Sequence, residues 1–215
     1  MNSLEEVDDR QKGSRLRIID AAWQAAAKRG LSRLSLGDVC VASGLGEESV
    51  REHFETKQDL LMGLLNDDSA QLEVILYRLE TAALSGADRL SRFVEAALEV
   101  GADPDRAAVR RDLWSIVLGR PDLREWAAER IRGRRTILRN WIERVIGDEF
   151  RPVPANALAS VLLALNDGLI LHSSLDPTSF RWENVGVTVD TILGGLRKDS
   201  LSTRNSTEEL FAVPQ

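Results

Sequence analysis

The chain has 215 residues, 43% of them hydrophobic, which suits one or two globular domains with a real core and excludes a largely disordered protein. It carries 28 basic and 34 acidic side chains, and the formal net charge of −6 argues against a basic surface spread over the whole molecule. The single cysteine, Cys40, excludes an internal disulfide framework and a multi-cysteine metal site.

Helical periodicity runs through nearly the whole chain and no hairpin signal occurs, which predicts an all-α fold. The first helix is expected from about Ser14 to Arg29, with Leu16 on its inner face and Gly30 as its stop. A second helix is expected after Ser35, whose hydroxyl can cap it in a capping box with Asp38.

A turn follows the second helix, because Gly44 tolerates positive φ. The third helix is expected at about 47–54, with Val50 and Phe54 facing inward. A long fourth helix should begin after Thr56, in a second capping box, and continue to about residue 83. These elements form an N-terminal three-helix domain with a helix-turn-helix, joined by the long helix to a C-terminal helical domain.

The rest of the chain also shows helical patterns. Further helices are expected at about 87–100, 105–118, 121–146, 154–173 and 182–197. The expected segments are a flexible N-terminal arm at 1–12, the helix-turn-helix domain at 13–60, the C-terminal domain at 61–198 and a flexible tail at 199–215. The arm and the tail are expected to be flexible because they lack a sustained apolar face.

The stretch from residue 17 to 61 resembles the DNA-binding domain of the tetracycline-repressor (TetR) family of bacterial transcription regulators. The matching positions are IIDAA at 18–22, Gly30, Ser35, DVC at 38–40, SGL at 43–45, HF at 53–54, and Lys57 with Leu60 and Leu61. The resemblance implies a homodimeric regulator, typically a repressor, that binds a palindromic double-stranded DNA operator through the third helix. It also implies release by a small-molecule effector bound in the C-terminal domain.

The outer face of the third helix and its surroundings supply the expected DNA contacts. They are Ser35, Glu47, Glu48, Ser49, Arg51, His53 and Lys57. The chain departs from the family pattern at three of the nearby positions. Gly46 replaces the usual capping serine, Glu48 replaces a small residue, and Arg51 replaces a phosphate-binding tyrosine.

The acidic character of the third helix has two interpretations. Negative charge in its first turn interacts favourably with the helix dipole and stabilises the helix by roughly 0.3 to 1 kcal/mol. Glu47–Arg51 and Arg51–Glu55 are also spaced for ion pairs worth about 0.2 to 0.5 kcal/mol each. Alternatively, one glutamate accepts a hydrogen bond from cytosine N4. Arg51 itself could bind a phosphate or grip a guanine.

Two apolar stripes in the last helices fit a symmetric dimer interface, although a protomer core would use the same spacing. The expected interface residues are Leu158, Leu162, Leu165, Leu169, Val185, Val189, Ile192 and Leu196. Large apolar and a few polar groups of the middle helices could line the effector pocket or simply form a core. The expected pocket residues are Phe93, Arg110, Trp114, Val117, Trp126, Trp141, Asn166 and His172.

An enzyme is not expected, because the two histidines, His53 and His172, lie in different domains and no nucleophile or phosphate-loop signature occurs. We accordingly expect no catalytic residue, no cofactor and no metal. No run approaches twenty apolar residues and no secretory signal precedes the first helix, so we expect a cytoplasmic protein without a membrane partner. The alternative function is a dimeric scaffold that does not bind DNA and presents its acidic third helix to a protein.

Overall fold

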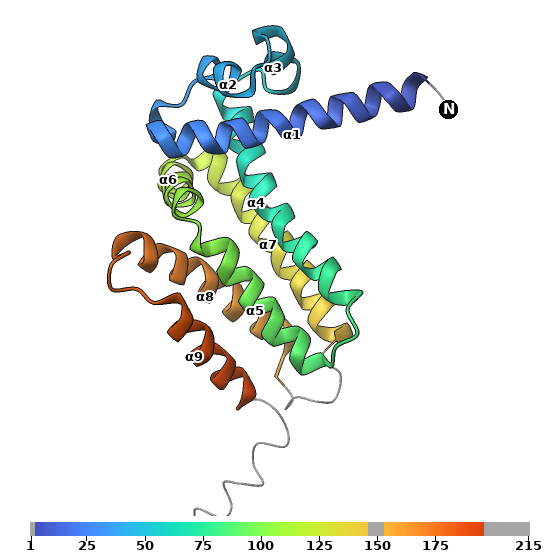
Figure 1. The fold of residues 1–215 in the computed structure, drawn as a ribbon, viewed down its shortest axis with the longest axis vertical. Coiled ribbons are helices and arrows are strands. Elements are labelled where there is room, and N and C mark those ends of the chain that lie inside the picture. Colours follow the sequence, from blue (N-terminus) through green and yellow to red (C-terminus); the bar gives the residue numbers. More distant parts are fainter. Residues whose placement is uncertain (1–2, 146–152, 196–215) are drawn as a thin grey trace, which may run out of the picture. The chain divides into compact units, whose positions relative to one another are not determined.

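The computed structural model describes residues 3–145 and 153–195, and within these ranges the only regular elements are helices (Figure 1). The helices are α1 (Ser3–Arg29), the short 3₁₀ helix η1 (Leu31–Arg33), α2 (Leu36–Ser43), α3 (Glu47–His53), α4 (Lys57–Glu80), α5 (Gly86–Ala102), α6 (Pro104–Gly119), α7 (Pro121–Val145), α8 (Ala155–Leu175) and α9 (Trp182–Gly194). The all-α prediction is confirmed. The predicted tail at 199–215 and Leu196 lie outside the described residues.

The chain divides into two compact units, each built from two stretches of sequence. Unit 1 combines Met1–Gln71 with Asp103–Ile131, and unit 2 combines Leu72–Ala102 with Arg132–Gln215. Unit 1 therefore contains the helix-turn-helix together with α6 and the first part of α7. The expected boundary at residue 60 follows the sequence motif, and it stays a prediction.

Helix α1 begins at Ser3, upstream of the expected start at Ser14, so it includes residues 3–12 of the segment predicted as a flexible arm. No proline or glycine occurs between residues 3 and 12, and nothing in that stretch stops a helix. The buried face of α1 includes Ile18, Ile19 and Trp23, whereas Leu16 is 58% exposed. The expectation that Leu16 faces inward is wrong, because the burial face is centred on positions 18–26.

The turns around α2 follow the sequence expectation closely. Ser35 caps α2: its hydroxyl accepts a hydrogen bond from the Asp38 amide at 3.2 Å, and Asp38 Oδ2 accepts one from the Ser35 amide at 3.0 Å. Arg29 also binds the Asp38 carboxylate. Gly30 and Gly44 have φ of 80° and 68°, which L side chains rarely adopt, so both turns require glycine.

The core of unit 1 holds α3 against α1 and α4. Val50 and Phe54 are 0% and 3% exposed, and the α4 backbone comes so close at Gly63 that an added Cβ would lie 2.6 Å from Phe54 Cε1 and 2.9 Å from Ile19 Cδ1. The same core takes in Val109, Leu113 and Val117 of α6, and α6 packs against α1 and η1. The start of α4 is fixed by the predicted Thr56–Asp59 capping box.

Unit 2 is built from α5, α8, α9, the last part of α4 and the last part of α7, and α5 packs against both α8 and α9 (Figure 1). Phe93 and Trp141 meet in its core with ring centroids 5.7 Å apart. Helix α4 ends at Glu80, before the expected end near residue 83, and Ser85 then caps α5 by accepting from the Asp88 amide at 3.1 Å.

We predict that Gly63→Ala destabilises the protein by about 1 to 3 kcal/mol, because the new methyl group overpacks the buried Phe54 and Ile19 side chains. Urea unfolding followed by circular dichroism measures the change. The matched control is Gly133→Ala in α7, where an added Cβ meets nothing within 4 Å and the gain in helix propensity stabilises by roughly 0.5 to 1 kcal/mol. Equal effects at the two sites would contradict the packing argument.

The capping box predicts a pH dependence. Hydrogen bonds from the Ser35 side chain and backbone, and then the charge of Arg29, lower the pKa of Asp38 below its ordinary value of 3.8. A lowered pKa in the folded state means that the carboxylate stabilises the fold above pH 3.8 and that this contribution is lost as the pH falls through the folded-state pKa. Asp38→Ala should therefore be less stable than wild type at pH 7, and the gap should close below pH 3.8. A gap that does not depend on pH in thermal melts would refute this role.

Candidate nucleic-acid interface and effector site

Helix α3 presents a polar face to solvent and packs against the core of unit 1 through its apolar side. Gly46 occupies its N-cap without a side-chain hydrogen bond, as the sequence predicts. Of the expected DNA-contact residues, Ser35, Glu47, Glu48 and Arg51 are exposed, and Ser49, His53 and Lys57 are half-buried. All seven lie in unit 1, on α3 or directly beside the caps of α2 and α4.

Two of the expected DNA-contact cations, Arg51 and Lys57, are already engaged in the free protein. Arg51 Nε donates to Glu47 Oε1 at 2.8 Å, which confirms the expected i,i+4 ion pair. The expected Arg51–Glu55 ion pair is not formed: Arg51 Nη1 donates instead to the Glu55 main-chain carbonyl at 3.4 Å, because residue 55 lies beyond the end of α3. Lys57 Nζ donates to the Ser32 carbonyl at 2.7 Å.

The free charges on α3 are therefore acidic. Within the described residues, Glu48 and Glu52 are exposed and take part in no hydrogen bond or ion pair, whereas Arg51 shares its charge with Glu47. The Ser35 hydroxyl belongs to the cap of α2, where it donates to Asp38 at 2.6 Å and accepts from the Asp38 amide. DNA would meet two unpaired carboxylates, and cations that must exchange partners.

The residues expected in one effector pocket are divided between the two units. Arg110, Trp114, Val117 and Trp126 belong to unit 1, and Phe93, Trp141, Asn166 and His172 belong to unit 2. In unit 1, Val117 is a core residue, and Trp114 and Trp126 pack partly buried against the same core. Arg110 is 8% exposed and binds the Asp68 carboxylate.

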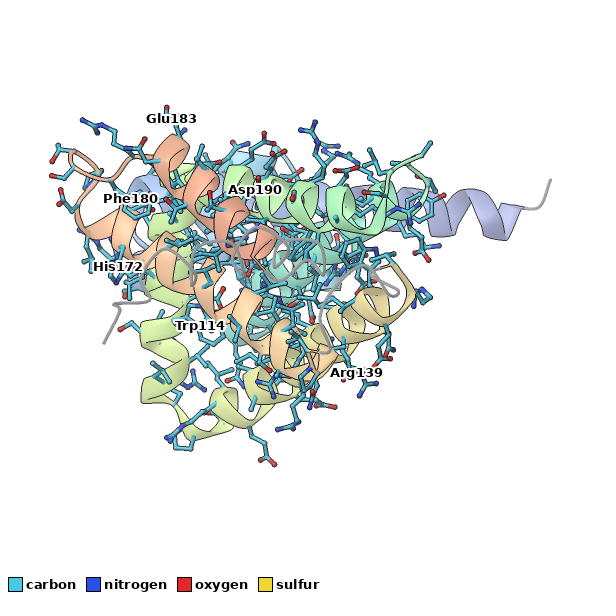
Figure 2. All side chains as sticks on the ribbon, turned by 90° about the horizontal axis from the view of Figure 1, so that it is seen from below. Trp114, Arg139, His172, Phe180, Glu183 and Asp190 are labelled. Atoms are coloured by element: carbon cyan, nitrogen blue, oxygen red, sulfur yellow. The ribbon has the colours of Figure 1, made fainter. Side chains whose placement is uncertain are left out.

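In unit 2 the expected pocket residues have different surroundings. Phe93 and Trp141 are buried, whereas His172 is exposed at the surface of α8 (Figure 2). Trp141 Nε1 and Asn166 Oδ1 are buried polar atoms without a hydrogen-bond partner among the described residues. Buried polar groups in proteins are nearly always paired, which makes these two atoms candidates for contact with a ligand.

A hollow of about 300 Å³ lies elsewhere in unit 2, between α5 and α9. It is lined by Leu84, Ala87, Asp88, Ser91, Arg92, Glu95, Asp190, Leu193 and Gly194, which include none of the expected pocket residues. Asp190 faces α5 (Figure 2) and accepts from the Ser91 hydroxyl, while Arg92 binds Glu95 at 2.7 Å. Its polar groups thus largely bind one another. Among the described residues, no group of three or more His, Cys, Asp or Glu side chains is placed to hold a metal ion.

The last two helices carry an exposed apolar face that differs from the expected stripes. Leu158, Leu162 and Val189 are buried inside the protomer, because α8 and α9 use this side to pack on the unit 2 core. Leu165, Leu169 and Val185 are partly buried against the same core, and among the expected residues that the structure describes only Ile192 is largely exposed. The exposed large apolar residues of the two helices are Val161, Leu171, Leu175, Val187 and Ile192, between 43% and 70% exposed.

Of these five residues only Ile192 belongs to the predicted interface set, and the interface itself stays a prediction. The signal was present in α8, where Ala157, Val161, Ala164, Gly168, Leu171 and Leu175 recur every three or four positions. A helix that is apolar on two faces does not reveal which one the protomer covers. By length and composition α8 also resembles a membrane span, with a mean hydropathy of 1.4, but core helices of soluble proteins pass the same test.

Comparisons with known proteins assign both halves of the chain. A model of the tetR family of bacterial regulatory proteins matches residues 18–63, and a model of the C-terminal part of BetI-type transcriptional repressors matches residues 86–197. No curated protein matches the chain in sequence.

Solved structures share the fold at low sequence identity. The fatty acid degradation regulator FadR from Bacillus halodurans is 19% identical, with 84% of this chain and 98% of that chain covered and a TM-score of 0.70. FadR from Bacillus subtilis, solved with stearoyl-CoA, is 18% identical, with 83% and 96% covered and a TM-score of 0.68. A transcriptional regulator from Saccharomonospora viridis, solved with choline, is 22% identical, with 86% and 98% covered and a TM-score of 0.67. Together with the two family models, the helix-turn-helix geometry of α2 and α3 shows that this chain belongs to the TetR family of bacterial transcription regulators.

Proposed function

We propose that the protein is a cytoplasmic homodimeric repressor that binds a palindromic operator through α3 and leaves it when a small molecule binds. The observation that carries this proposal is the capped and tightly packed helix-turn-helix at the residues that the tetR model matches. Both matching family models describe regulators of transcription rather than enzymes. Two structural neighbours were solved with small molecules, which supports a regulator that responds to a ligand.

In the proposed complex the exposed face of α3 lies in the major groove. Ser49 and Arg51 contact base edges or phosphates, with Glu47 and Glu48 beside them. His53 and Lys57 bind phosphates, and Lys57 must first leave the Ser32 carbonyl. Because its hydroxyl already caps α2, Ser35 contributes mainly by fixing the position of the α2 N-terminus.

A second copy of the chain is the proposed cover for the exposed apolar face of α8 and α9. A monomer rarely exposes a contiguous row of large apolar side chains, and the row here runs along α8 through Val161, Leu171 and Leu175. Ala157, Ala164 and Gly168 alternate with them and allow close helix approach. Two recognition helices brought together in this way suit half-sites about one DNA turn apart.

The effector is proposed to bind in unit 2, next to Trp141 and Asn166. The unpaired indole N–H calls for an acceptor on the ligand, and the unpaired amide oxygen calls for a donor. Phe93 supplies an apolar wall beside Trp141. Stearoyl-CoA and choline, bound by two structural neighbours, differ too much in charge and size to identify this ligand.

The alternative of a scaffold that does not bind DNA is not favoured, because residues 18–63 match the DNA-binding model of the family. One observation still supports the scaffold: the carboxylates of Glu48 and Glu52 on α3 are unpaired among the described residues. Selection of a duplex from a random library separates the two functions, because a scaffold would select no DNA sequence.

We predict that the wild-type protein selects a palindromic duplex from a random library and that its affinity falls steeply with salt. Glu47→Ala should raise affinity for all duplexes and make the logarithmic salt slope steeper by about one, because it frees Arg51 for a phosphate. If Glu48 reads a cytosine, Glu48→Ala should cost about 1 to 3 kcal/mol of discrimination at one base pair.

The control for both variants is Glu73→Ala, an exposed acidic residue of α4 in unit 2, which should leave the operator affinity unchanged. Failure of the wild type to enrich any sequence would reject the DNA-binding function. Unchanged discrimination in Glu48→Ala would show that Glu48 only stabilises the helix.

We predict that Val161→Glu and Leu171→Glu turn the dimer into a monomer at micromolar concentration, because each would bury an unpaired charge in the interface. Sedimentation velocity gives the oligomeric state. Tyr77→Glu on α4 is the control, since Tyr77 is 71% exposed and lies outside α8 and α9. A Val161→Glu protein that still sediments as a dimer would place the interface elsewhere.

A further inference from the structure

A polar cluster inside unit 1 joins three helices that are far apart in the sequence. It consists of Trp23 on α1, Asp67 and Asp68 on α4, and Arg106 and Arg110 on α6, and we call these five residues the α4–α6 latch. None of them lies on the DNA-facing helices α2 and α3.

The inner half of the latch is a buried ion pair. Arg110 Nε and Nη2 both bind Asp68 Oδ1, and the two side chains are only 9% and 11% exposed. Arg110 Nη1 is buried and has no partner, so Asp68 supplies all the pairing that this guanidinium has in the described residues. A buried charge that depends on a single partner is strongly disfavoured once that partner is lost.

The outer half of the latch connects α6 to α1 as well as to α4. Trp23 Nε1 donates to Asp67 Oδ2 at 2.9 Å, and Arg106 Nη1 lies 3.7 Å from the same oxygen. The Arg106 guanidinium also lies over the Trp23 ring, 4.9 Å from its centroid, in cation–π geometry. One carboxylate thus holds a residue of α1 and a residue of α6 together.

Helix α6 lies in a different structural unit from most of the residues that the C-terminal family model matches. The C-terminal family model covers residues 86–197 and includes α6, yet α6 packs within unit 1 against α1 and η1. The η1 segment contains Ser32, whose carbonyl holds Lys57 beside the recognition helix. A shift of α6 would therefore reach one of the expected DNA contacts, Lys57, through η1.

We propose that the α4–α6 latch sets operator affinity by holding α1 and α6 in the arrangement that binds DNA, with its five members acting as positioning residues. The inference rests on the proposed function. When the latch is closed, α1, α4 and α6 move as one body; when Arg110 leaves Asp68, unit 1 samples arrangements that bind DNA poorly. The operator then binds only the fraction of molecules with a closed latch, which lowers the apparent affinity.

The test compares Asp68→Asn with the wild type on the duplex that the wild type selects, at a temperature where circular dichroism shows both proteins folded. Asp68→Asn should bind the operator about 5- to 150-fold more weakly, the range typical of coupling between sites. The salt slope should stay that of the wild type, because the closed state makes the same phosphate contacts. A merely destabilised but folded protein would keep the wild-type operator affinity.

Trp23→Phe provides a second route if Asp68→Asn does not fold. It keeps an aromatic ring beneath Arg106 and removes the N–H that binds Asp67, so we expect a smaller loss of affinity with the same salt slope. Glu80→Gln is the control: it breaks the ion pair with Arg144, whose Nε lies 3.1 Å from Glu80 Oε1 within unit 2, and should leave operator affinity unchanged.

Two results would overturn the latch. One is wild-type affinity in a folded Asp68→Asn or Trp23→Phe protein, and the other is a loss of affinity accompanied by a smaller salt slope, which would mean that phosphate contacts themselves are lost. Absence of any operator binding by the wild type would instead reject the proposed function. The failures of the two inferences are therefore distinguishable.

Discussion

The DNA-binding region depends on the close approach of α4 to the end of α3 at Gly63. Helix α3 has seven residues and no side-chain cap, and a helix this short does not form alone in water. Its position comes from burying Val50 and Phe54, each worth roughly 1.5 to 3 kcal/mol, against Ile19 and a backbone without a Cβ. Because the inner face supplies this stability, the outer face is free to vary. That freedom explains how an acidic surface can occupy a DNA-binding position without disturbing the fold.

The acidic surface of α3 opposes DNA binding less than its sequence suggests, because its neighbouring cations can exchange their present partners for phosphates. Arg51 and Lys57 are held by Glu47 and by the Ser32 carbonyl at exposed or half-buried positions. Exposed ion pairs contribute about 0 to 1 kcal/mol and a hydrogen bond to a charged group about 1.5 to 3 kcal/mol, so a phosphate, which is itself a charged acceptor, can replace either partner. Binding then exchanges one charge-assisted contact for another. The unpaired carboxylate of Glu48, in the first turn of α3, is the feature that this exchange does not remove.

Local signals in the sequence predicted local structure well. The capping boxes at Ser35 and Thr56 and the positive φ of Gly44 depend on residues at most four positions apart, and all three were predicted. Contacts across long separations were not. The partner of Arg110 is 42 positions away, and periodicity alone does not identify it. In α8 the periodicity does not show which side of the helix is buried, because the helix is apolar on two faces. Which face joins the core depends on how α5 packs against α8.

The latch also explains why two adjacent carboxylates occur on α4. Consecutive helix positions point about 100° apart, so Asp67 and Asp68 reach different neighbours from one turn of helix. Arg106 and Arg110 are four apart and share one face of α6, which lets both reach α4 at once. Loss of one pair leaves the other to join α4 to α6, and the apolar core that Val109, Leu113 and Val117 share with α1 still holds α6 in unit 1.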